Sequence, residues 1–412
     1  MIWLLIGYMF LFVHRPFEVW PALGDMHLER VYMLATLAFF AVSPQKLWKN
    51  NFQTAAYVTF AGAVVVCWLM SPWMEGGQDT VENWFKIFVF YVLLVSVIND
   101  EKALRTILLA FLVVMTLYML HSVWEYKNGR HTFRMGIARM IGVDKTLGDP
   151  NSFGGSIVYA LPLVRAFWRC RPTFGMKSFL LFYVLLSAGC VLLTGSRSSL
   201  LGLLVWCLYA VLVSSQRWKV LLPLILAAPL AWTVLPPSLQ TRFETIIDPS
   251  VGPANAKESG DSRLEGLLTG LELFGRSPLT GVGPGVWRPA TGRLLESHNL
   301  YGQLLGELGG LGGAAFLLIL VGFWVNIRWQ RKHNPYSVRD GPDFCYEVSM
   351  AIGISVLLML FEGNFGHNLF RFNWLWYGGF LIIARHCVVQ RAAVSEEDLT
   401  EEVPDGAAVA VA

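Results

Sequence analysis

The sequence has little charge. Asp, Glu, Lys and Arg make up 15% of its 412 residues, where soluble globular proteins carry about 25%. Hydrophobic residues reach 55%, and the mean hydropathy is +0.50. This composition excludes a disordered chain, a collagen-like chain and a small secreted scaffold, and it disfavours an ordinary cytosolic enzyme. It is typical of an integral membrane protein.

Paired cysteines and a strong excess of basic charge are also missing. The net charge is +3, too small to indicate nucleic acid as a partner. The six cysteines stand singly and without C-x-x-C spacing, so the sequence predicts neither a zinc site nor a disulfide framework. They are Cys67, Cys170, Cys190, Cys207, Cys345 and Cys387.

Long apolar runs fill most of the chain. A helix needs about 20 mostly apolar residues to cross about 30 Å of hydrocarbon, so such runs predict transmembrane helices. The first run lacks the basic start and cleavage site of a signal peptide, so we expect it to be retained. We therefore predict an all-α integral membrane protein with about 12 transmembrane helices, near 2–13, 28–43, 54–72, 85–98, 103–122, 152–168, 178–194, 199–213, 218–236, 299–327, 346–362 and 369–389.

Lys and Arg in short loops stay preferentially in the cytoplasm, which predicts the orientation. Sixteen of them lie in the even-numbered connections and the C-terminal segment, against five in the short odd-numbered connections. Both termini should therefore be cytoplasmic. The expected organisation is a transmembrane region of about nine spans (1–236), a large outward-facing loop with an amphipathic helix (237–298), three further spans (299–389) and a disordered, acidic cytoplasmic tail (390–412).

A first candidate site is the polar segment Thr194-Gly195-Ser196-Arg197-Ser198-Ser199, between two apolar spans. An arginine at membrane depth is costly unless it is paired, reaches the interface or binds a ligand. Two interpretations stay open at this point. Arg197 either anchors the span beside a serine N-cap, or it binds an anion.

A second candidate is Arg263, in Asp261-Ser262-Arg263-Leu264-Glu265. Ser262 and Glu265 fit a capping box, and leucines follow at helical spacing, so we expect an amphipathic helix to begin here. Arg263 would then lie in the first turn, where a bound anion would offset its unfavourable interaction with the helix dipole. The alternative is an arginine at the rim of an interfacial helix.

Two further polar segments face outward. His298, before the tenth span, has a side chain suited to acid–base chemistry near neutral pH, or it simply lies beside a cap formed by Ser297 or Asn299. Glu362, His367 and Arg371 could line a cavity mouth, although we favour an ion pair of Glu362 with Arg371 or His367.

Neighbouring motifs are interpreted as structural. Gly302, Gly306 and Gly310 recur every fourth residue, which indicates close helix packing. The segment Gly281-Val282-Gly283-Pro284-Gly285 lacks the pattern of a phosphate loop and is interpreted as turns. The segment Asp149-Pro150-Asn151-Ser152 is interpreted as a turn and a helix cap. Glu307 projects away from His298 on an ideal helix and is not expected to pair with it.

Three stretches in this order resemble the O-antigen ligase and O-antigen polymerase superfamily of bacterial envelope glycosyltransferases. They are T-G-S-R-S-S-L-L-G around Arg197, S-R-L-E-G-L-L-T-G-L-E-L-F-G-R-S-P-L-T-G-V-G-P-G-V-W from Ser262, and H-N-L-Y-G-Q-L-L-G-E-L-G-G-L-G from His298. Together they cover residues 194–312. The combination is more specific than any one motif.

The resemblance implies a membrane-embedded, C-type inverting glycosyltransferase that needs neither metal nor another cofactor. Its donor would be a glycan on undecaprenyl pyrophosphate, and its acceptor lipid A–core or another glycan or protein. Arg197 and Arg263 would bind the pyrophosphate, while His298 would activate the acceptor hydroxyl. Membrane lipids would be the other partners, and the site would face the periplasm from a multi-pass protein of the bacterial inner membrane.

Other functions remain open from the sequence. The resemblance does not separate a ligase from a polymerase or from a protein O-oligosaccharyltransferase, and it identifies neither the sugar nor the acceptor. A polytopic transporter or lipid flippase should place charges or broken helices near the bilayer midplane, often in matching halves. The candidate groups here gather at the outer ends of spans and no internal repeat is apparent, which favours an enzyme over a transporter or a non-catalytic assembly subunit.

Overall fold

The computed structural model describes residues 1–44, 46–134, 136–144, 148–170, 172–248, 255–293, 295–334 and 342–401, apart from the side chains of 21, 134, 255–262 and 394–401. The chain is a bundle of helices, and its only described strands form one antiparallel hairpin, β1 (Thr132–Arg134) and β2 (Ile137–Arg139). The predicted fold class, an all-α membrane protein, is confirmed.

The first half of the chain supplies most of the bundle. Its helices are α1 (Ile2–His14), α2 (Pro16–Val19), α3 (Pro21–Asp25), α4 (Leu28–Val42), α5 (Phe52–Leu69), α6 (Met74–Val97), α7 (Glu101–Lys127), α8 (Pro150–Ala160), α9 (Val164–Arg169), α10 (Phe174–Thr194) and α11 (Arg197–Val213). A short 3₁₀ turn at Leu161–Leu163 joins α8 to α9.

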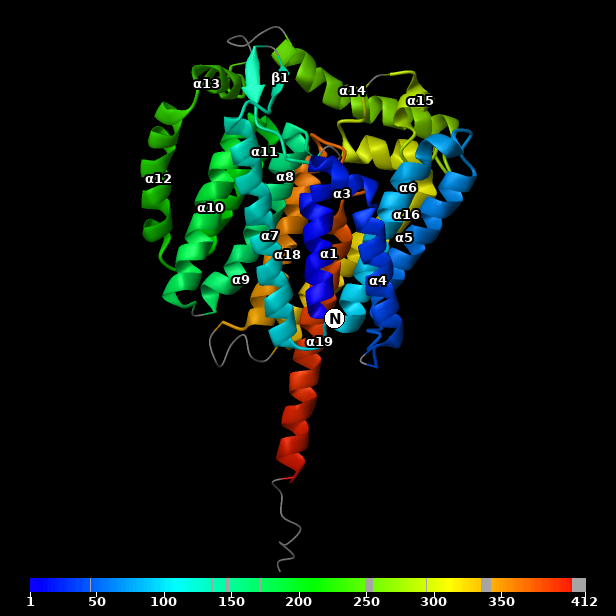
Figure 1. Ribbon diagram of the computed structural model, residues 1–412, viewed down its shortest axis with the longest axis vertical. Helices are drawn as coiled ribbons and strands as arrows, with labels where there is room; N and C mark the ends of the chain where they lie inside the picture. Colours follow the sequence, from blue (N-terminus) through cyan, green and yellow to red (C-terminus); the bar gives the residue numbers. More distant parts are fainter. Residues whose placement is uncertain are drawn as a thin grey trace, which may run out of the picture.

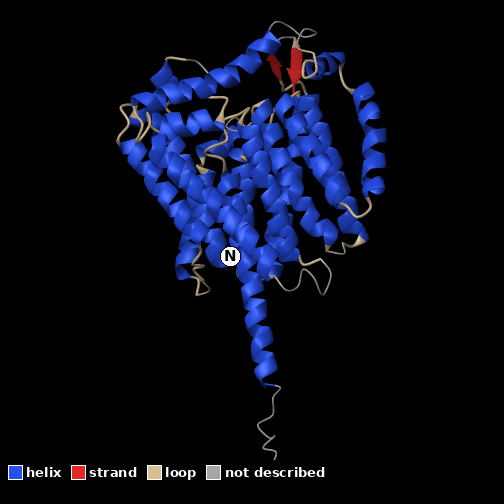
Figure 2. Cartoon of the chain, turned by 180° about the vertical axis from the view of Figure 1, so that it is seen from behind, coloured by secondary structure: helices blue, strands red, loops and turns tan. Residues whose placement is uncertain are grey.

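The second half adds further helices to the bundle and a layer across one end of it. Its helices are α12 (Arg217–Val234), α13 (Pro237–Glu244), α14 (Asn255–Arg276), α15 (Trp287–Thr291), α16 (Leu300–His333), α18 (Phe344–Gly363) and α19 (Phe372–Glu401). Figure 1 shows α13, α14, α15 and β1 together at one end of the bundle, whereas the N-terminus and the far end of α19 lie at the other. Figure 2 shows the strands at that same outer end from behind.

Eight segments of the described chain are long and apolar enough to cross a membrane: Ile2–Val19, α5, α6, α7, α10, α12, α16 and α18. The other four predicted spans are helical too: α4 has 15 residues, α11 has 17, the sixth is divided between α8 and α9, and the twelfth lies on α19. The division falls at Pro162, which cannot donate a helical hydrogen bond. The total of twelve spans stays a prediction.

Two boundaries differ from the sequence prediction. Helix α19 continues to Glu401, so residues 390–401 are helical rather than disordered, while 402–412 lie outside the described residues. Helix α16 is not one continuous span, because Gly309 has φ 59° and ψ −158°, which are not helical values. The part before Gly309 packs under α14, and the part after it descends beside α5 (Figure 1).

The break in α16 frees backbone groups that the turn after α14 satisfies. Val282 N–H donates to the Gly306 carbonyl and Gly283 N–H to the Glu307 carbonyl, both at 2.9 Å, and Gly310 N–H donates to the Pro278 carbonyl at 2.8 Å. Buried Glu307 accepts from Gly285 N–H at 2.9 Å. Irregular backbone at membrane depth is tolerated where protein groups pair with it in this way. The prediction of turns at 281–285 is consistent with this.

The glycines of α16 let α14 approach closely. A Cβ added to Gly302 would lie 2.4 Å from the Gly266 carbonyl oxygen, and one added to Gly270 would lie 2.2 Å from the Gly302 carbonyl oxygen. Gly266 and Gly270 of α14 therefore pack against Gly302 and Gly306 of α16. The interpretation of the α16 glycines as a packing surface is correct. This contact holds α14 over the start of α16.

Candidate functional site

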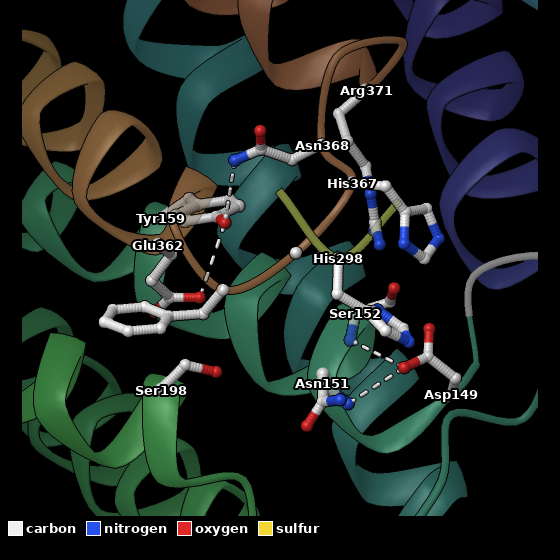
Figure 3. A pocket seen from close by; sticks show the side chains of 12 residues that line it. Asp149, Asn151, Ser152, Tyr159, Ser198, His298, Glu362, His367, Asn368 and Arg371 are labelled. Carbon is white, nitrogen blue, oxygen red and sulfur yellow. Dashed lines mark hydrogen bonds between the residues drawn. The ribbon is translucent and has the colours of Figure 1, made fainter. Parts of the chain in front are cut away.

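A pocket opens at the outer end of the bundle, where α8, α11, α16 and the connection between α18 and α19 meet. Its free volume, including the mouth, is about 400 Å³. Figure 3 shows the side chains that line it: Asp149, Asn151, Ser152, Tyr159, Ser198, His298, Glu362, Phe365, Gly366, His367, Asn368 and Arg371. Nearly all are polar, although they lie at the end of an apolar bundle.

The start of α8 forms one wall. Asp149 caps the helix, with its carboxylate accepting from Asn151 N–H at 3.1 Å and Ser152 N–H at 3.2 Å, as the sequence predicts. Burial raises the pKa of Asp149, but the hydrogen bonds from Ser152 and the nearby Arg371 charge hold it below its ordinary value. Asp149 is therefore a carboxylate at neutral pH.

The connection after α18 forms the opposite wall. Buried Arg371 donates to Ser156 Oγ at 3.1 Å, and Glu362 accepts from the Tyr159 hydroxyl at 3.4 Å. None of the ion pairs among the described residues joins Glu362 to Arg371 or His367. The favoured ion pair is therefore wrong, because Arg371 bonds to Ser156 and Glu362 bonds to Tyr159, both on α8.

His367 lies in the same connection. Its ring centroid is 5.7 Å from that of His298. Burial lowers the pKa of His367 to about 4, helped by the charge of Arg371 and opposed by Asp149. The imidazole is therefore neutral near pH 7, and one ring nitrogen is left as an acceptor.

His298 stands two residues before α16, and that helix is capped by its neighbour. Asn299 Oδ1 accepts from Tyr301 N–H and Gly302 N–H, each at 3.0 Å, as expected for a cap. Gly266 of α14 lies against the His298 backbone, since a Cβ there would be 3.4 Å from His298 N. His298 is half-buried and lines the pocket.

Arg197 is the first residue of α11, and Ser196 caps that helix by accepting from Ser199 N–H at 3.4 Å. The serine N-cap is therefore present, and it does not exclude that Arg197 binds an anion. Arg197 Nη1 donates to Thr245 Oγ1 at 3.1 Å. Ser198, the next residue, lines the pocket.

Arg263 lies about two turns inside α14, because this helix begins at Asn255 and not at Ser262. The prediction of Arg263 in the first turn is therefore wrong, and the side chain of Ser262 lies outside the described residues. The guanidinium sits 4.9 Å from the centroid of the Phe365 ring. Burial and the charge of Arg197 lower the pKa of Arg263 to about 10, so two cations that repel each other lie beside the pocket.

The comparison with known families bears on this arrangement. The family model described as O-antigen ligase matches residues 182–317. This part of the chain resembles an O-antigen ligase domain. No curated protein matches the chain.

The matched region includes α11, α14 and the start of α16, and thus Arg197, Arg263 and His298. The predicted resemblance to that superfamily is confirmed. The match supports a multi-pass membrane enzyme that acts on glycans, as O-antigen ligases and polymerases do. The rest of the pocket comes from segments outside the match, at residues 149–159 and 362–371.

The fold brings together residues that the sequence leaves apart. Glu362, His367 and Arg371 share the pocket with His298, while Arg197 and Arg263 flank it through Ser198 and Phe365. Sequence reasoning missed Asp149, Tyr159 and Asn368 as lining residues. Asp149 carried a signal as a cap, but nothing in the sequence indicates that its helix faces the connection after α18.

Proposed function

We propose that the protein is a glycosyltransferase that moves a glycan from undecaprenyl pyrophosphate to a hydroxyl of lipid A–core at the periplasmic face of the inner membrane. The observation that carries the proposal is the pair of arginines, Arg197 and Arg263, that flank a pocket containing His298. Two guanidiniums that repel each other are stabilised by a ligand with several negative oxygens, and a pyrophosphate is such a ligand.

Each group has a defined part in the reaction. His298 accepts the proton of the acceptor hydroxyl, whose oxygen bonds to the anomeric carbon of the donor sugar. The bond from that carbon to the phosphate oxygen breaks, and its electron pair leaves with the pyrophosphate. Arg197 and Arg263 stabilise the negative charge that develops there. A single displacement of this kind inverts the anomeric centre, and the lipid pyrophosphate supplies the activated leaving group.

A polymerase or a protein O-oligosaccharyltransferase would use the same donor chemistry. Purified protein given lipid-pyrophosphate glycan and candidate acceptors, with product masses measured, distinguishes these functions. Transfer to lipid A–core supports the ligase, growth of the lipid-linked chain a polymerase, and transfer to polypeptide a protein ligase. No transfer to any acceptor, by protein that is folded and binds the donor, would contradict the enzyme proposal.

The orientation is part of the proposal. Helices α13 and α14 lie at the end of the bundle opposite the N-terminus (Figure 1). Arg263 lies on α14, Arg197 donates to Thr245 directly after α13, and Gly266 of α14 lies against the His298 backbone. Single cysteines at these positions should react with a membrane-impermeant thiol reagent from the periplasm. Labelling from the cytoplasmic side alone would reject both the orientation and the mechanism.

A further inference from the structure

Two buried oxygen atoms in the pocket have no hydrogen-bond partner within the described chain. They are Glu362 Oε1 and Asn368 Oδ1, on side chains that belong to residues only 4% and 5% exposed. Buried polar groups in proteins are nearly always paired, because an unpaired one costs the free energy of its lost hydration. Two such atoms in one pocket indicate that a ligand completes it.

The hydrogen bonds around these atoms define what the ligand must bring. Asn368 Nδ2 donates to the Met359 carbonyl at 2.9 Å and to the Tyr159 hydroxyl at 3.2 Å. A carbonyl only accepts, so the nitrogen of the amide must face it, and the unpaired atom is the oxygen. Tyr159 receives one hydrogen from Asn368 and donates its own to Glu362 Oε2. Asn368 Oδ1 is therefore an acceptor, as Glu362 Oε1 is in the ionised carboxyl group, so the ligand must bring donors. A third buried atom of the pocket without a described partner, His367 Nδ1, accepts or donates according to its tautomer.

The arginine side of the site has the opposite requirement. Arg197 and Arg263 offer only donors, and a pyrophosphate offers only acceptors. A pyrophosphate therefore suits the arginines but cannot satisfy Glu362 and Asn368. Phe365 lies between the pocket and the arginines, because it lines the pocket and its ring centroid is 4.9 Å from the Arg263 guanidinium.

We infer that the pocket binds the first sugar ring of the donor, with ring hydroxyls donating to Glu362 Oε1 and Asn368 Oδ1. This assignment rests on the proposed function and adds to it a subsite for the sugar. The ring is bonded directly to the pyrophosphate, so it must lie next to the arginines, as this pocket does. The free space of about 400 Å³ includes open solvent at the mouth, so the ring occupies the mouth of the pocket, and the acceptor approaches from the His298 side.

The test uses three lipid probes with the full-length protein in nanodiscs. The first is polyprenyl pyrophosphate alone, the second carries one N-acetylglucosamine, and the third carries a cyclohexyl ring, which has the size of a sugar ring but no hydroxyl. The wild type should bind the sugar probe about tenfold more tightly than the other two, the size expected of one or two hydrogen bonds. Equal affinity for the sugar and cyclohexyl probes would overturn the inference while leaving pyrophosphate binding, and so the proposed function, intact.

Glu362→Gln tests the carboxylate itself. The Tyr159 hydroxyl keeps the amide oxygen on its side, so the amide nitrogen takes the Oε1 position and replaces an acceptor with a donor. The variant should lose most of the tenfold preference and bind polyprenyl pyrophosphate within twofold of the wild type. Glu347→Gln is the matched control, because Glu347 is a buried glutamate at the other end of α18, paired with Arg165 and Arg169. It should keep the preference.

The remaining outcomes are also decisive. If Glu362→Gln weakens all three probes alike, or changes only the KM of the acceptor, the sugar does not bind here. If it fails to fold, the comparison of the three probes on the wild type still decides. Binding of none of the probes by folded wild type would reject the proposed function together with this subsite.

Discussion

Replacing Gly302 with alanine should disrupt the site without touching any group that binds substrate. The added Cβ would lie 2.4 Å from the Gly266 carbonyl oxygen and 2.9 Å from the Leu267 Cα, both on the backbone of α14. Ordinary carbon contacts are about 3.5 Å, so α14 and α16 must separate by about 1 Å. Overpacking of this kind typically costs about 1–3 kcal/mol of stability.

The same separation of α14 and α16 should also lower the rate of transfer. Arg263 lies on α14 and His298 directly precedes α16, so a separation of the two helices changes the distance between them. A displacement of about 1 Å in a catalytic site can lower the rate about 100-fold. We expect Gly302→Ala to lower transfer by one to two orders of magnitude, measured as product formed per folded protein, with a lower unfolding temperature in detergent.

Gly275→Ala on α14 is the matched control. No atom lies within 4 Å of the position a Cβ would take there, and alanine favours a helix over glycine by about 0.5–1 kcal/mol. This variant should keep full activity and unfold at the same or a higher temperature. Wild-type activity and stability in Gly302→Ala would refute the reasoning, because they would show that the two backbones are not in contact.

Four further outcomes are expected. Arg197→Lys and Arg263→Lys should each lower transfer by one to three orders of magnitude, if the lost bonds contribute about 1.5–4 kcal/mol; full activity at equal abundance would make these arginines anchors, and Arg276→Lys, an exposed change on α14, is the control. His298→Ala should abolish transfer but leave donor binding largely unchanged, and an active His298→Asn variant would remove His298 from the chemistry. Glu307→Leu should leave Gly285 N–H unpaired and cost about 1–3 kcal/mol of unfolding free energy, whereas Glu307→Gln should keep most of it; equal unfolding temperatures for the two would contradict the role of the carboxylate. The pKa of His367 is lowered to about 4 from about 6.5 in the unfolded chain, so the unfolded state binds more protons between these values and stability should fall as the pH drops from about 6.5 to 4. His367→Gln should reduce this dependence, and an unchanged profile of unfolding temperature against pH would contradict it.

The sequence determines which segments become helices, because hydropathy and capping are local properties. Runs of apolar residues predict the spans, and Ser196, Asn299 and Asp149 cap the helices that follow them. The order of Arg197, Arg263 and His298 is likewise sufficient to indicate the family. The break at Gly309 is not readable from the sequence, because glycines also occur in regular membrane helices.

Tertiary structure alone decides how these groups meet. The start of α14 was predicted at the wrong residue, because a capping box at 262 fits the local sequence as well as the observed start at Asn255 does. Glu362 and Arg371 look like an ion pair in the sequence, but α8 gives each of them another partner, Tyr159 and Ser156. Composition and periodicity thus determine a membrane bundle with polar groups at its outer end. Whether those groups form a pocket depends on which helices pack together, and that follows from contacts such as Gly270 on Gly302, whose partners lie far apart along the chain.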